Sequence, residues 1–155
     1  MNTISFKHSG NVGDIIYSIP AMMSLLKNKN ADKADYYLNL NHSVNYSGWH
    51  PLGNVLLNRD FAEKIIPLLK SQSCINEVNI YNGEDIQVDL DGFRKVKINP
   101  FTYSIPHWYF LFIIGTHWDL SKPWIELEPD DTYKDFVLVS RNNRYKSQYI
   151  NYNFF

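Results

Sequence analysis

The fold is decided near the N-terminus by the stretch Ile4-Ser5-Phe6-Lys7-His8-Ser9-Gly10-Asn11-Val12-Gly13-Asp14. Apolar and polar residues alternate from Ile4 to Lys7, which predicts a β-strand. The two glycines that follow predict a tight loop. Apolar residues then recur at helical spacing as far as Leu26, so a helix is expected directly after the loop, with a kink or a restart at Pro20.

The rest of the chain continues the alternation of strands and helices. A helix is expected from Asp60 to Gln72, where Asp60 and Glu63 have the spacing of a capping box, and a largely buried helix from His107 to His117 that packs against the sheet. Strands are expected at 36–40, 77–81, 86–90 and 136–140, and the pair around Asn82 forms either a hairpin or successive strands of the sheet. This order predicts a Rossmann-like, three-layer α/β/α domain with a mostly parallel sheet.

Composition excludes several classes of function. The chain of 155 residues is about one domain long, and its 45% hydrophobic residues are sufficient for a buried core. A net charge of -1 argues against nucleic-acid partners. The longest apolar stretch, 108–114, is far shorter than the ~20 residues of a membrane span, and Cys74 is the only cysteine. We therefore expect a cytoplasmic protein without an internal disulfide or a membrane span.

The glycine loop predicts a ligand site of a restricted kind. It matches neither the dinucleotide fingerprint nor a P-loop, so nicotinamide and ATP are not expected there. Asp14, at the start of the helix, could accept a proton from a substrate hydroxyl or could simply stabilise the helix terminus. The histidines and Cys74 are scattered, and no metal-ligand spacing is present.

The segment His8 to Ala21 resembles the opening of glycosyltransferase family nine, the heptosyltransferase-like enzymes. A related group of bacterial and phage proteins is similar also at 66–69, 89–94, 123–125 and 139–145. The resemblance covers nearly the whole chain, which corresponds to about half of such an enzyme. It implies one half of a GT-B fold, with residues 1–135 as the acceptor-side domain and 136–155 as the start of a truncated second domain or a C-terminal tail.

The resemblance also implies a reaction. It would be inverting, metal-independent transfer from a nucleotide-sugar donor to an acceptor hydroxyl, with no cofactor beyond that co-substrate. Asp14 matches the proposed general base of the family. The acceptor is expected to contact the loop and a tryptophan that could stack on a sugar ring, namely His8, Ser9, Gly10, Asn11, Gly13 and Trp49. Three basic residues are expected to reach the donor diphosphate if a second domain is present: Arg141, Arg144 and Lys146.

Each of these residues has an alternative interpretation. His8 could bond nearby backbone, the basic residues could form a solvated tail, and Trp49 could pack in a core. Asp89 and Asp91 could form a paired-carboxylate site, but solvated charges on one outward face are favoured. The alternative functions are a non-catalytic glycan- or protein-binding module and a structural or assembly protein, and self-association of the truncated domain is a further expectation.

Overall fold

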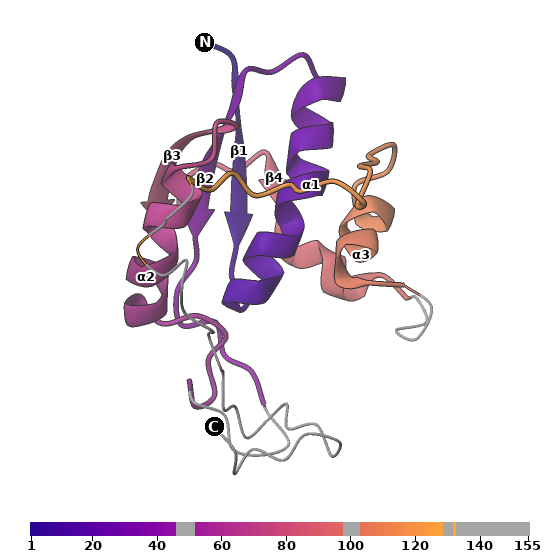
Figure 1. Cartoon of the computed structure of the whole chain (residues 1–155). Helices are drawn as coiled ribbons and strands as arrows, with labels where there is room; N and C mark the ends of the chain where they lie inside the picture. Colours follow the sequence, from indigo (N-terminus) through magenta and orange to yellow (C-terminus); the bar gives the residue numbers. More distant parts are fainter. Residues whose placement is uncertain (46–51, 98–102, 129–131, 133–155) are drawn as a thin grey trace, which may run out of the picture.

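The computed structural model describes residues 1–45, 52–97, 103–128 and 132. Four parallel strands form one sheet in the order β3-β2-β1-β4 (Figure 1). The strands are β1 (Thr3–His8), β2 (Lys33–Leu38), β3 (Ile75–Ile80) and β4 (Val88–Asp89). The helices are α1 (Val12–Asn28), α2 (Arg59–Lys70), α3 (Ile105–Phe112) and the 3-10 helix η1 (Leu90–Lys95). The predicted Rossmann-like α/β class with a parallel sheet is confirmed.

The N-terminal βαβ unit follows the prediction closely. β1 pairs with β2 along its whole length, from Thr3 opposite Lys33 to His8 opposite Leu38. Helix α1 continues through Pro20, so the expected restart does not occur. A parallel pair joined by one helix places the carboxyl ends of both strands at the same edge of the sheet, next to the start of α1.

Two details of the middle of the chain were predicted wrongly. Helix α2 begins at Arg59, and its N-cap is Asn58, whose side-chain oxygen accepts from the Phe61 N–H at 3.0 Å. An asparagine reaches this N–H as well as an aspartate does, so a capping box starting at Asp60 is not formed. The hairpin alternative is also wrong, because β3 and β4 lie on opposite edges of an all-parallel sheet.

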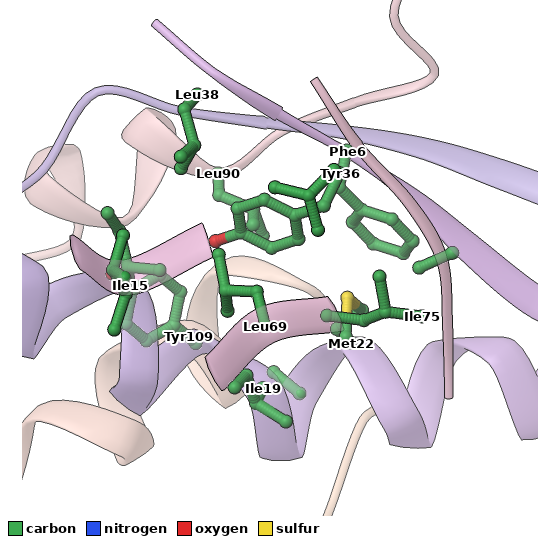
Figure 2. Packing of buried hydrophobic residues seen from close by; sticks show 14 of the residues in the cluster. Phe6, Ile15, Ile19, Met22, Tyr36, Leu38, Leu69, Ile75, Leu90 and Tyr109 are labelled. Atoms are coloured by element: carbon green, nitrogen blue, oxygen red, sulfur yellow. The ribbon is translucent and has the colours of Figure 1, made fainter. Parts of the chain in front are cut away.

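The core lies on one face of the sheet, against α1 and α2. Strand side chains alternate, so Phe6 and Tyr36 point into this core together with Ile19 of α1 and Leu69 of α2 (Figure 2). The opposite face is polar and is reached by the connection between β3 and β4, where Gln87 bonds to Ser5. The helices of the described residues thus cover one face, and the second helical layer of a three-layer fold is not found among them.

Helix α3 is shorter and more exposed than expected. It packs against α1 and η1, and it buries Pro106 and Tyr109. Leu111 remains 48% exposed, and Ile114, just past the helix, 92% exposed. The prediction of a helix buried on most of its surface against the sheet is therefore wrong, because α1 lies between α3 and most of the strands (Figure 1).

The segment after α3 crosses the outside of the helical layer. Its His117 N–H donates to Ser24 Oγ of α1 at 2.9 Å. Farther along, Glu126 receives hydrogen bonds from the backbone and the hydroxyl of Ser73, and Gln72 bonds to its backbone. The chain therefore ties α3 to the corner between α2 and β3 (Figure 1). In the part of the chain described here, no helix has the length and apolarity needed to span a bilayer.

Candidate functional site

The loop between β1 and α1 and the first turn of α1 contain two glycines, and only one of them, Gly10, could not be replaced by a larger residue. The Gly10 N–H donates to His8 Nδ1 at 2.7 Å. A Cβ atom on Gly10 would lie 2.4 Å from His8 Cε1 and 2.9 Å from Asp14 Cβ. At Gly13 a Cβ would meet only Tyr17 Cε2, at 3.9 Å. The loop therefore requires Gly10, whereas Gly13 is exposed and sterically unconstrained.

His8 supports this loop from inside the molecule. Its Nδ1 accepts from Gly10, so the ring carries its proton on Nε2, which lies 2.6 Å from the Tyr109 hydroxyl. That hydroxyl in turn donates to the backbone carbonyl of Asp14 at 3.0 Å. His8 is completely buried and both its nitrogens are engaged, so it holds the loop and the first turn of α1 in place. A direct contact between this ring and a ligand would require the loop to rearrange.

Ser9 joins the loop to the ends of two other elements. Its N–H donates to Asp91 Oδ1 at 2.8 Å, its hydroxyl donates to Asp91 Oδ2, and Asn39 Nδ2 donates to the same hydroxyl at 3.1 Å. Burial pushes the pKa of Asp91 upward, but the hydrogen bonds that its carboxylate accepts from the Ser9 N–H and hydroxyl lower it, and the pKa lies well below its ordinary value. Ser9 itself is fully buried.

Asp89 and Asp91 were expected to be solvated charges on one outward face, but the structure places them in different surroundings. Asp89 is 53% exposed and pairs with Lys7 at 2.8 Å. Asp91 lies in the first turn of η1 and turns its carboxylate toward Ser9. The interpretation of Asp91 as a solvated charge is wrong, because the chain turns into a 3-10 helix after Asp89 and loses strand alternation there.

Asp14 stands in the first turn of α1 with two partners on one oxygen. Its Oδ2 accepts from the Asn11 N–H at 3.2 Å and contacts Arg94 Nη2. The Asp14 side chain is 14% exposed and that of Arg94 is 41% exposed. The Arg94 guanidinium also lies over the Phe93 ring, with Cζ 4.9 Å from its centroid. Arg94 is one of the site residues that the sequence did not indicate, although it belongs to the stretch 89–94 on which the resemblance rests.

A cavity of about 560 Å³ opens beside these groups. The cavity lies where strands β1, β2 and β4 end and helix η1 begins. In the sheet, β2 lies on one side of β1 and β4 lies on the other, so the cavity is at the position where the strand order reverses. Open parallel sheets bind their ligands at this place. Its polar lining comprises Lys7, Asn39, His42, Asp89, Asp91, Arg94 and Lys95. Asp14 lies directly behind Arg94, and Ser9 lies behind Asp91.

A second hollow of about 650 Å³ lies between α1 and the start of α3. It is mainly aromatic and is lined by Tyr17, Tyr103, Ser104, Ile105, Pro106, Trp108, Leu120 and Trp124. The buried indole nitrogens of Trp108 and Trp124 have no hydrogen-bond partner among the described residues. None of the described residues that line this hollow is charged, so it differs in chemistry from the cleft at the strand ends.

Several predicted site residues lie outside the described residues. These are Trp49, Arg141, Arg144 and Lys146, together with the segment 136–155 expected to begin a second domain.

Burial raises the pKa of the Cys74 thiol to about 11, which leaves the thiol protonated at neutral pH. In the described part of the chain, no three histidine, cysteine or acidic side chains gather in a way that could hold a metal ion.

No protein-family profile, curated protein or solved structure matches this chain. The chemistry of the site has to be inferred from its own residues. The cleft combines cationic, carboxylate and amide side chains within one hollow, a set that can hydrogen-bond a ligand rich in hydroxyl or acidic groups. The Asp14 carboxylate lies next to the cleft, in contact with the lining residue Arg94.

Proposed function

We propose that the chain is the acceptor-side domain of a glycosyltransferase-like protein and that the cleft at the strand ends holds a sugar acceptor. The observation that carries the proposal is the position of Asp14. This carboxylate stands in the first turn of α1, behind Arg94, at a polar cleft formed by the carboxyl ends of parallel strands. The resemblance of 8–21 to family nine supports the same assignment.

In the proposed reaction Asp14 takes the proton from an acceptor hydroxyl. The acceptor oxygen then forms a bond to the donor sugar carbon, while the bond from that carbon to the diphosphate breaks and its electron pair leaves with the nucleoside diphosphate. Attack from the opposite face inverts the carbon. Both Asp14 contacts use Oδ2, so Oδ1 is the oxygen that we assign to the acceptor proton.

The other residues of the cleft receive supporting roles. Asn39, Asp89 and Lys95 line it with side chains that can bond sugar hydroxyls. Gly10 and Asn11 shape the loop next to Asp14, and Ser9 fixes that loop to η1 through Asp91. The nucleotide-sugar donor belongs to a second domain in this proposal, with Arg141, Arg144 and Lys146 of the chain near its diphosphate.

A non-catalytic binding module is the second candidate, and one observation favours it. The Asp14 carboxylate is already engaged by the Asn11 N–H and by Arg94, which is how a carboxylate that only stabilises a helix start would be used. Such a module would bind the acceptor in the same cleft without transferring a sugar. The two candidates differ in whether a donor is ever used.

Calorimetry distinguishes them. Monosaccharides and nucleotide sugars are titrated separately into the protein together with its donor-binding domain. Binding of both classes supports the transferase, and binding of a sugar without any nucleotide sugar supports the module. Absence of binding by every sugar tested would contradict both.

Asp14→Asn tests the base assignment in the protein together with its donor-binding domain. We expect kcat to fall by about 10²- to 10⁴-fold without a rise in KM, because the variant keeps the shape of the side chain and loses the base. The matched control is Asp60→Asn, which removes the acid from the first turn of α2. Normal turnover by Asp14→Asn would show that the assignment is wrong.

A further inference from the structure

Arg94 takes part in two environments at once. Its Nη2 contacts the carboxylate of Asp14, while the residue also lines the cleft at the strand ends. A guanidinium carries five N–H donors in a planar fork, and among the described residues only Nη2 is engaged by a carboxylate. With 41% of its side chain exposed, Arg94 retains donors for a ligand in the cleft.

Besides Arg94, one more cation in the cleft lining, Lys95, is placed to contact a ligand. Lys95, the next residue of η1, also lines the cleft and is exposed. The third cation of the lining, Lys7, is paired with Asp89. Asp91 turns both carboxylate oxygens to Ser9. Arg94 and Lys95 are therefore the cations with which a negatively charged ligand would interact, and Asp14 is the internal anion that competes for Arg94.

We propose that the cleft binds an oxyanion group of its ligand, a phosphate or a carboxylate, between Arg94 and Lys95, and that this group takes Arg94 from Asp14. Planar, bidentate contacts with such groups are the preferred use of a guanidinium. The exchange leaves the Asp14 carboxylate without its ion-pair partner when a ligand is present. Anion binding itself does not depend on the proposed function. The role of the released carboxylate as a base does, and on that basis the acceptor is an acidic or phosphorylated sugar.

The competition predicts the size of one effect: removing the negative charge of Asp14 should improve anion binding by more than the change in net charge alone would. Inorganic phosphate and, separately, acetate are titrated into the full chain at constant ionic strength and followed by amide chemical shifts in NMR. We expect Asp14→Asn to tighten the binding of the anion by about two- to fivefold, the size of one partly exposed ion pair. Arg94→Gln and Lys95→Gln should each weaken it by at least as much.

The pair of Arg59 and Glu63 on α2 supplies matched controls. Both side chains are exposed and lie 3.9 Å apart, and neither residue lines the cleft. Glu63→Gln removes a carboxylate from an arginine, as Asp14→Asn does, and Arg59→Gln removes the same charge as Arg94→Gln. We expect neither control to change phosphate binding. Equal effects in the controls would overturn the proposal, because they would reduce it to the net charge of the protein.

The remaining outcomes are also decisive. Unchanged or weaker phosphate and acetate binding in Asp14→Asn would contradict the exchange. If Asp14→Asn does not fold, Lys95→Gln, an exposed position, still tests the anion site, and unchanged affinity in that variant would overturn it. The phosphate and acetate arms distinguish the two kinds of oxyanion. Anion binding as predicted without any sugar transfer would refute the proposed function alone, whereas binding of neutral sugars without anion binding would refute the exchange alone.

Discussion

At the scale of single residues, the buried His8 ring determines the shape of the loop that leads to Asp14. It accepts the Gly10 N–H and bonds to Tyr109, whose hydroxyl holds the carbonyl of Asp14. The loop and the first turn of α1 are therefore fixed to α3 by fully buried side chains. A carboxylate held in this way keeps its position without relying on the ligand.

Gly10 and Gly13 should respond oppositely to alanine. Gly10→Ala places a methyl group 2.4 Å from His8 Cε1, so we expect a loss of about 1–3 kcal/mol in the free energy of unfolding. Gly13→Ala adds a methyl group in open space inside helix α1, so we expect a gain of up to about 1 kcal/mol. Urea unfolding measures both. A stable Gly10→Ala protein with an unchanged fold would show that the contact between His8 and the loop is described wrongly.

Asp91 should make the stability depend on acid pH. Its pKa is lower in the folded protein than in the unfolded chain, so the ionised group stabilises the fold above the unfolded pKa of about 4, and this contribution is lost as the pH falls toward the folded pKa. We expect Asp91→Asn to lower the free energy of unfolding at pH 7 by about 1–3 kcal/mol and to flatten its fall below pH 4. Urea unfolding at several pH values checks this, with the exposed Asp85→Asn as control. An acid dependence as steep as that of the unmodified chain would contradict the assignment.

At the scale of elements, helix α2 shows how an N-cap is chosen. Asn58 caps the helix through the Phe61 N–H, while Asp60 lies in its first turn. We expect Asn58→Ala to destabilise the protein by about 1 kcal/mol and Asp60→Ala by less, because Asp60 does not cap the helix and stabilises its first turn through the helix dipole. Thermal unfolding of the two variants gives the order. A larger effect at Asp60 would restore the capping box predicted from the sequence.

Elements formed by local patterns were predictable, and those formed by distant contacts were not. The alternation before Gly10 and the helical spacing after it predict β1 and α1 because neighbouring residues decide both. A strand was expected at 86–90, but only Val88 and Asp89 pair with β1, and the turn into η1 moves Asp91 off the strand face. The exposure of α3 depends on the position of α1, which no local pattern contains.

At the scale of the whole molecule, the candidate site is assembled from residues far apart in the chain. Asp14 was predictable because it stands beside the loop, but its partner Arg94 is 80 residues away. Ser9 and Asp91 are separated by 82 residues, and His8 and Tyr109 by 101. The parallel topology brings these segments to one edge of the sheet. The sequence could nominate the stretch 89–94, but only the fold shows that it faces the loop.

Two of the hollows formed by the described residues differ in chemistry, and we assign the ligand to the polar one. The cleft at the strand ends is lined by charged and amide side chains, while the hollow between α1 and α3 is aromatic. Proteins hold sugars by hydrogen bonds or by stacking on aromatic rings. The polar cleft would bind a sugar mainly in the first way and the aromatic hollow mainly in the second.

The most direct test is an NMR titration of the chain with a sugar acceptor that binds in calorimetry, followed through the backbone amides. The account predicts that the amides of Ser9, Asn39 and Arg94 shift with increasing sugar, while those of Tyr17 and Trp124 in the aromatic hollow do not. Shifts confined to the aromatic hollow, with the strand-end cleft unchanged, would contradict the central claim.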